Sequence, residues 1–161
     1  MDTWTNPLFQ SVYDHMEENM TFLCNNEGGT SFSFTTNYQR IRFMILLTLN
    51  RQKSSLRIEV RYPIKLSHKH YKSMVQKVSE YNCNHYLGFL TFDTSDGELA
   101  STWATPLEDA TPMSEDALVH LFSVLLRGVC NMGHTAMEME FGLPAEVRDE
   151  IKALTDGTQD I

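Results

Sequence analysis

Nothing in this sequence of 161 residues approaches the length of an apolar membrane span. The longest apolar stretches, 43–47 and 121–126, are far shorter than the roughly 20 residues that a spanning helix needs. Near the N-terminus stands an acid, Asp2, where a secretory signal would carry lysines, and no apolar stretch follows it. We therefore expect a cytoplasmic protein that does not contact membranes.

Cysteine is scarce and occurs in an odd number. Cys24, Cys83 and Cys130 lie far apart, whereas disulfide frameworks usually show an even count at closer spacing, so reduced thiols are expected. The metal-binding spacings CxxC and HExxH are absent, and His68 and His70 lie two residues apart, so they point to different sides of a helix. The sequence predicts no metal ion and no cofactor.

Signatures of catalysis and of nucleotide binding are missing as well. Gly28-Gly29 lies between a predicted helix and a predicted strand, the reverse of the order in a phosphate-binding loop. No serine lies in a GxSxG motif, and none of the cysteines lies in a catalytic signature. Glu17-Glu18 are adjacent on a predicted helix and point apart, which makes them a poor acid–base couple. We expect that the protein is not an enzyme.

The composition that remains is that of a globular domain. Hydrophobic residues make up 42% of the chain and aromatic residues 11%. A chain of this length can build a core without help from disulfides or metals. Gly142 and Pro144 mark a boundary, so we predict one α+β domain over residues 1–142, followed by an appended C-terminal helix and a frayed tail over residues 143–161.

Helix start signals and apolar spacing predict the helices. Asn6-Pro7 is typical of an N-cap followed by the first helical residue. The apolar stripe behind it recurs at spacings of three and four: Phe9, Val12, Tyr13, Met16, Met20 and Leu23. Leu66-Ser67 and Met113-Ser114 each combine a staple residue with a cap before a further stripe. We expect Gly128 and Gly133 to bend or break the last of these helices.

Alternation of apolar and polar residues predicts five strands. They lie at residues 31–35, 41–49, 56–62, 86–93 and 98–104. The second and third form a hairpin in which the apolar residues coincide: Leu49 faces Leu56, Leu47 faces Ile58, and Ile45 faces Val60. The order α-β-β-β-α-β-β-α plus a C-terminal helix predicts an antiparallel five-stranded sheet flanked by helices.

The stretch from residue 56 to residue 133 contains a recognisable succession of motifs. They are Tyr62-Pro63 after an alternating strand, Tyr81-Asn82 at a helix end, Leu87-Gly88-Phe89, Phe92-Asp93, the turn Asp96-Gly97, and Met113-Ser114-Glu115 before a long helix. This succession resembles the YbjN family of bacterial regulators, whose fold is similar to that of the type III secretion chaperones. The resemblance covers the element order over about residues 7–142. It implies a small acidic monomer or dimer that binds other proteins and has no catalytic centre.

Charge is distributed unevenly along the chain, whose net charge is −8. Residues 40–77 contain ten basic residues and a single acid, Glu59, while the rest of the chain contains three basic residues and twenty acids. Two interpretations stay open: a folded dipole with solvated faces, or a basic sheet face that meets an acidic partner segment.

One face of the predicted sheet mixes apolar side chains with arginines. If Phe43, Ile58, Leu90, Phe92, Leu99 and Trp103 face the helices, the opposite face holds the candidate partner-binding residues: Arg42, Met44, Leu46, Arg57, Arg61, Leu87 and Phe89. A solvated face should be polar, and this mixture is typical of interfaces. The face therefore predicts a protein client or a homodimer, unless the first or last helix covers it.

The leading hypothesis is a non-catalytic chaperone, adaptor or regulator that binds a segment of a partner protein. Addition of a client strand to an exposed sheet edge is one way to do so. The alternative is a nucleic-acid binder that uses the basic segment 40–77 with Tyr38, Phe43 and Tyr62. The acidic net charge disfavours nucleic acid, because domains that bind it usually show a dominant basic footprint.

Overall fold

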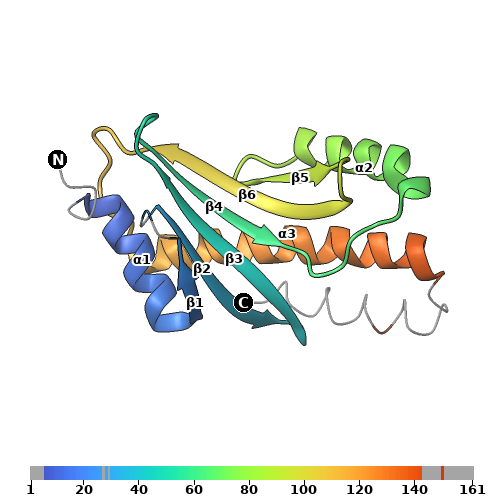
Figure 1. Cartoon of the computed structure of the whole chain (residues 1–161), viewed down its shortest axis with the longest axis horizontal. Coiled ribbons are helices and arrows are strands. Elements are labelled where there is room, and N and C mark those ends of the chain that lie inside the picture. The colour runs from blue at the N-terminus through green and yellow to red at the C-terminus, as the bar shows by residue number, and fades with distance from the viewer. Residues whose placement is uncertain (1–5, 27, 29, 143–149, 151–161) are drawn as a thin grey trace.

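An antiparallel sheet of six strands organises the computed structural model, which describes residues 6–26, 28, 30–142 and 150 (Figure 1). The strands are β1 (Thr21–Asn25), β2 (Ser31–Tyr38), β3 (Ile41–Asn50), β4 (Ser55–Arg61), β5 (Phe89–Asp93) and β6 (Glu98–Pro106). Their order across the sheet is β1-β2-β3-β4-β6-β5. The C-terminal helix predicted within 143–161 lies outside the described residues, apart from residue 150.

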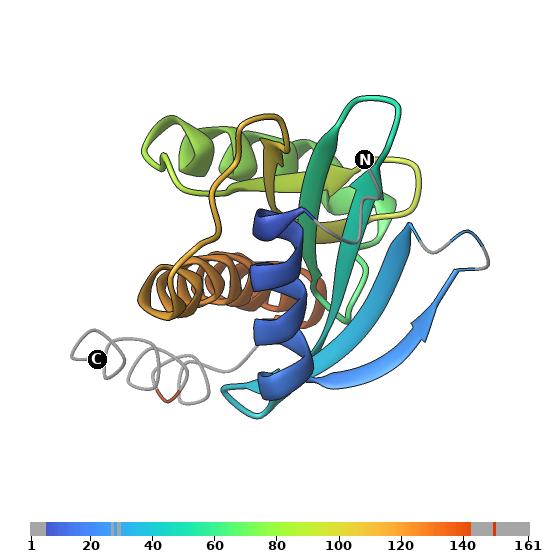
Figure 2. The ribbon, with the colours of Figure 1, turned by 90° about the vertical axis from the view of Figure 1, so that its left-hand side faces the viewer.

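Three α-helices cover one face of the sheet. They are α1 (Pro7–Asn19), α2 (Tyr71–Cys83) and α3 (Glu115–Phe141), with a short 3-10 helix, η2 (His68–His70), before α2. Figure 2 shows α1 and α3 on the same side of the strands, and α2 lies along β5 at the sheet margin. The opposite face, turned toward the viewer in Figure 1, has no described helix over it.

The β3–β4 hairpin has the predicted register. Leu49 pairs with Leu56, Leu47 with Ile58, and Ile45 with Val60, and all six side chains are buried. The pairing follows from alternation with a period of two, since a slip of one residue would place every apolar side chain on the wrong face. Core residues from Leu8 to Ala136 join in one hydrophobic cluster between this hairpin and the helices.

The five-stranded prediction is wrong by one strand, β1. We expected the first helix to continue through Leu23, but it ends at Asn19 and the backbone of Met20 is extended. The next residues pair with β2, and the ring of Phe22 contacts that of its partner Phe34 edge-on. Met20 and Leu23 fit the helical spacing, yet a contact with a distant strand outweighs that local pattern.

The predicted break in α3 is also wrong, because the helix runs without interruption from Glu115 to Phe141. Gly128 and Gly133 serve packing instead. A Cβ atom at residue 128 would lie 2.5 Å from the Tyr81 hydroxyl, and one at residue 133 would lie 2.1 Å from the Tyr62 ring. The helix ends where Gly142 adopts a left-handed conformation, with φ of 58°.

Ser67 ties the start of η2 to the end of α3. Its hydroxyl makes no capping bond to the short helix. Instead, the Ser67 backbone N–H and Oγ–H donate to the Glu140 carboxylate at 3.0 and 2.9 Å. These two hydrogen bonds, with a smaller contribution from His70, hold the pKa of Glu140 below its usual range.

We predict that Glu140 contributes stability at neutral pH that is lost in acid. Because its pKa is lower in the folded than in the unfolded chain, the contribution is complete above the unfolded pKa of about 4.3 and disappears as pH falls through the folded value. Urea unfolding of Glu140→Gln at neutral and acidic pH should therefore show a smaller acid-induced loss than the wild type. Glu17→Gln, an exposed change on α1, should follow the wild-type curve, and an identical loss in E140Q would contradict the assignment.

Candidate functional site

The face that no described helix covers, here called the open face, is ordered in rows across four strands. One row contains Leu46 on β3, Glu59 on β4, Thr102 on β6 and Phe89 on β5. The next row contains Met44, Arg61, Ala100 and Thr91 on the same strands. Side chains of alternate residues share a face, so Arg42 and Asp93 continue the pattern beyond Met44 and Thr91.

Met44 and Phe89 expose apolar surface on the open face. Their side chains are 40% and 45% exposed, and Leu46, next to Met44 on the same face of β3, is half-buried. Neighbouring residues on β3 that point to the helices, such as Ile45 and Leu47, have no exposed surface at all. Exposed Met and Phe beside arginines are frequent in protein interfaces, so this composition suits docking of a protein.

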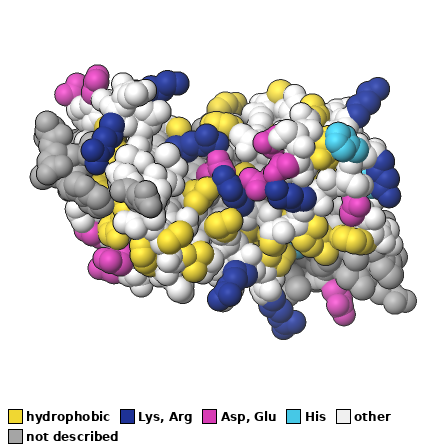
Figure 3. All heavy atoms as spheres, viewed as in Figure 1, with side chains coloured by type: hydrophobic (Ala, Val, Ile, Leu, Met, Phe, Trp, Pro, Cys, Tyr) yellow, Lys and Arg dark blue, Asp and Glu magenta, His cyan; other side chains and the backbone are white. Residues whose placement is uncertain are grey.

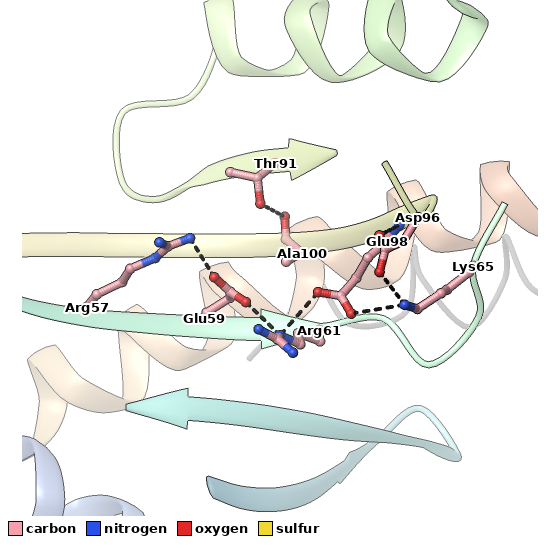
Figure 4. Close-up of polar contacts among 8 residues, drawn as sticks. All are labelled: Arg57, Glu59, Arg61, Lys65, Thr91, Asp96, Glu98 and Ala100. Carbon is pink, nitrogen blue, oxygen red and sulfur yellow. Dashed lines mark hydrogen bonds and ion pairs between the residues drawn. The ribbon is translucent and has the colours of Figure 1, made fainter. Parts of the chain in front are cut away.

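A row of alternating charges runs along the open face. This charge stripe consists of Arg57, Glu59, Arg61, Glu98, Lys65 and Asp96, in that order (Figure 4). Glu59 accepts hydrogen bonds from Arg57 at 2.5 Å and from Arg61 at 2.6 Å, and Arg61 also lies 3.2 Å from Glu98. Figure 3 shows basic and acidic side chains alternating across the middle of this face, with hydrophobic side chains around them.

The stripe changes the role expected for Arg57 and Arg61. Both guanidinium groups already lie against acids of the same chain, so they are not spare cations for an acidic partner. At the other end, a hydrogen bond from Lys65 lowers the pKa of Asp96, so both groups carry charge at neutral pH. Exposed ion pairs contribute only about 0–1 kcal/mol each, so the stripe shapes the surface more than it stabilises the fold.

Arg42 and Leu87 behave differently from the other predicted residues. Arg42 is exposed and makes no ion pair with any residue that the structure describes. Leu87 lies before β5, is half-buried and packs against the core, so its predicted position on the open face is wrong. The reason is Gly88, whose φ of 75° interrupts the alternation that we extended back from Phe89.

A shallow hollow of about 260 Å³ lies over β6 on the open face. The β4 side chains Arg57, Glu59 and Arg61 form one wall, and β5 forms the other through Thr91 and Asp93. Part of the floor is Ala100, which is small and therefore leaves the space open. The hollow is polar, so it suits side chains of a partner better than an apolar ligand.

The sheet has two edges, and one of them is closed. The Asn82 side chain of α2 accepts a hydrogen bond from the Leu90 backbone N–H and donates one to its carbonyl oxygen, each at 2.8 Å. These bonds occupy the outward backbone groups of Leu90, near the start of β5, which an added strand would need. At the other edge, β1 is exposed along its length but is bulged between Phe22 and Cys24, which disturbs regular pairing. Docking on the open face fits this geometry better than strand addition.

Another hollow, of about 290 Å³, lies on the helix side and includes Gln39 and His134. Next to it, Cys130 Sγ lies 3.4 Å from Gln39 Oε1 and 3.7 Å from His134 Nε2. Burial raises the pKa of Cys130 to about 11 and lowers that of His134. A nucleophilic cysteine needs the opposite shift, because only the thiolate attacks, so this pair is not arranged for covalent catalysis.

The described part of the chain gives no support for a metal site or a membrane-spanning helix. No three His, Cys, Asp or Glu side chains converge there in a way that could hold a metal ion. Within the same residues, no helix has the length and apolar character to cross a membrane. Each of the three cysteines is free.

Two of the three aromatic residues of the nucleic-acid alternative are buried, and the third is half-buried. Phe43 is fully buried, Tyr62 is 3% exposed, and Tyr38 packs against the core. The Tyr62 hydroxyl donates to Met137 Sδ inside the molecule. Nonspecific binding of single-stranded nucleic acid uses exposed aromatic rings beside cations, and Phe43 and Tyr62 do not offer such rings.

Comparison with known proteins gives a loose likeness in fold. No protein-family model matches the chain, and no curated protein matches it in sequence. Among solved structures, it is similar to the Yersinia pestis type III secretion chaperone SycH in complex with a stable fragment of YscM2, with a TM-score of 0.45 and 12% sequence identity. The match covers 76% of this chain and 97% of the other. Membership of the YbjN family therefore stays a prediction.

Proposed function

We propose that the protein is a non-catalytic chaperone or adaptor of the cytoplasm that holds a segment of a partner protein against its open face. The observation that supports this most directly is the exposure of Met44 and Phe89 on a sheet face with no described helix over it. The three free thiols are those expected in a reducing compartment. Burial of Phe43 and Tyr62 weighs against nucleic acid as the partner.

The partner segment is expected to combine apolar and acidic residues. Apolar side chains would cover Met44, Leu46 and Phe89, and an acidic side chain would pair with Arg42, which has no acidic partner among the described residues. Arg57 and Arg61 contribute less, because Glu59 and Glu98 already neutralise them. The paired charges on β4 lie between the apolar side chains of β3 and Phe89 on β5, and they keep the face hydrated until the partner binds.

Site-specific photo-crosslinking in cells would test this proposal. A photoreactive phenylalanine analogue at Phe89 should cross-link to a partner protein, because that side chain is one of the exposed apolar groups of the proposed contact. The matched control is Val119, which is 51% exposed on α3 and lies on the helix side. Equal yields and the same products from the two positions would contradict the proposal. Leu46→Asp in the Phe89 probe chain should abolish the specific product.

A further inference from the structure

The open face is complementary to itself. Its β4 strand is a ridge of the long side chains Arg57, Glu59 and Arg61, whereas β6 beside it presents Ala104, Thr102 and Ala100 in the same rows. The hollow over β6 lies between that ridge and β5. A two-fold axis running between β4 and β6, along the strands, would place the ridge of each copy over the β6 hollow of the other.

The same axis brings the outer strands together in matching pairs. It places β3 of one copy over β5 of the other, row by row. Leu46 then meets the partner's Phe89, and Met44 meets the partner's Thr91. One step further along the strands, Arg42 meets the partner's Asp93. An apolar pair and an ion pair therefore form on each side of the axis, without any change in the register of either sheet.

The charges of the Arg42 and Asp93 pair fit this arrangement. Arg42 has no acidic partner among the described residues of its own chain. Asp93 accepts hydrogen bonds from the Ser95 hydroxyl and backbone N–H, which lower the pKa of its carboxyl group and keep it charged. Two sheets packed face to face lie about 10 Å apart, a distance that an arginine and an aspartate can bridge from opposite sides.

We propose that a second copy of this chain covers the open face, in a two-fold dimer whose axis runs between β4 and β6. The inference rests on the proposed function, because it takes the same surface as a protein-docking face and names an occupant for it. Self-association then protects Met44 and Phe89 from water while no partner segment is bound. A client would have to displace the second copy, which couples client binding to the dimer equilibrium.

Charge reversal at Arg42 and Asp93 tests the dimer directly. In a dimer of R42D, two acids face each other at each contact, and in a dimer of D93R two cations do. Each variant should therefore weaken association by about tenfold or more. Mixing the two variants should restore it, since both contacts in the mixed dimer then join opposite charges. Sedimentation would follow the single variants, and native mass spectrometry would detect the mixed dimer.

Each outcome of this experiment has a definite reading. A mixed dimer that forms while both single variants are monomeric supports the proposal. A wild-type chain that stays monomeric at its highest soluble concentration overturns it, as does a dimer that neither substitution weakens. A mixture that fails to associate also overturns it, provided that circular dichroism shows both variants folded. Asp93→Asn, which keeps an acceptor for Ser95, should fold normally and weaken the dimer less than D93R.

The dimer and the proposed function can fail separately. If the wild type is monomeric but the Phe89 probe still cross-links to another protein, only the dimer is wrong. If the chain forms the charge-dependent dimer and the Phe89 probe cross-links only to a second copy, the dimer stands and the client is wrong.

Discussion

Replacing Leu47 with Asp is expected to abolish cooperative folding, whereas replacing its neighbour Leu46 with Asp is expected to leave the fold intact. Leu47 has no exposed surface and packs between β2, β4 and the helices, so a carboxylate there would be buried without a partner. Desolvation of such a charge costs several kcal/mol, which is comparable with the whole stability of a domain of this size.

Leu46 provides the matched control, because it is adjacent in sequence and points to the open face. It lies directly across from Glu59, so the added carboxylate should cost up to about 1 kcal/mol through repulsion between neighbouring strands. Circular dichroism and urea unfolding of the two variants would measure the contrast. Two variants that lose similar stability would show that both faces of β3 are buried, and the open face would then not be available for docking.

The hairpin at the centre of this contrast could be predicted because its information is local. Apolar residues recur at every second position along 41–49 and again along 56–62, and the register that makes these two sets coincide determines which side chains meet. Two of the three predicted helix starts were equally readable, since Asn6 and Ser114 accept the backbone hydrogen bonds expected of N-caps, whereas Ser67 makes no such bond. In each of these cases the residues that determine the structure lie within about fifteen positions of one another along the chain.

The features that were missed depend on contacts between distant residues. Strand β1 is defined by pairing with β2 and by the ring contact of Phe22 with Phe34, while its own sequence continues a helical spacing. The hydrogen bonds between Asn82 and Leu90 at the edge of β5 depend on where α2 packs, and no local sequence pattern predicts them.

The sequence could predict the strand face of several candidate residues, because that face depends on local alternation. Alternation correctly placed Arg42, Met44 and Leu46 on the face away from the helices. It could not show that Glu98 neutralises Arg61, because β6 lies beside β4 only through a connection of more than thirty residues. The part of the charge stripe visible in sequence is Arg57, Glu59 and Arg61, which alternate along one face of the same strand.

Replacing Gly133 with Ala is expected to destabilise the protein although alanine favours helices. In the interior of α3, alanine should gain up to about 1 kcal/mol from helix propensity. The new methyl group would lie 2.1 to 2.4 Å from three atoms of the Tyr62 ring, which is 3% exposed and cannot move aside freely. Overpacking of this kind costs about 1–3 kcal/mol, so the net effect should be a loss.

A double-mutant cycle with Tyr62→Leu would show whether the ring is the cause. Removing the ring makes room for the methyl group, so G133A should cost less, or even stabilise, in the Y62L background. Gly128, which lies earlier on α3, provides a comparison in which a smaller loss of stability is expected. A Cβ at Gly128 meets the Tyr81 hydroxyl, which is the end of a side chain that can turn away. Urea midpoints with unchanged slopes would measure each step. A Gly133→Ala variant more stable than the wild type would mean that α3 lies further from β4 and Tyr62 than described.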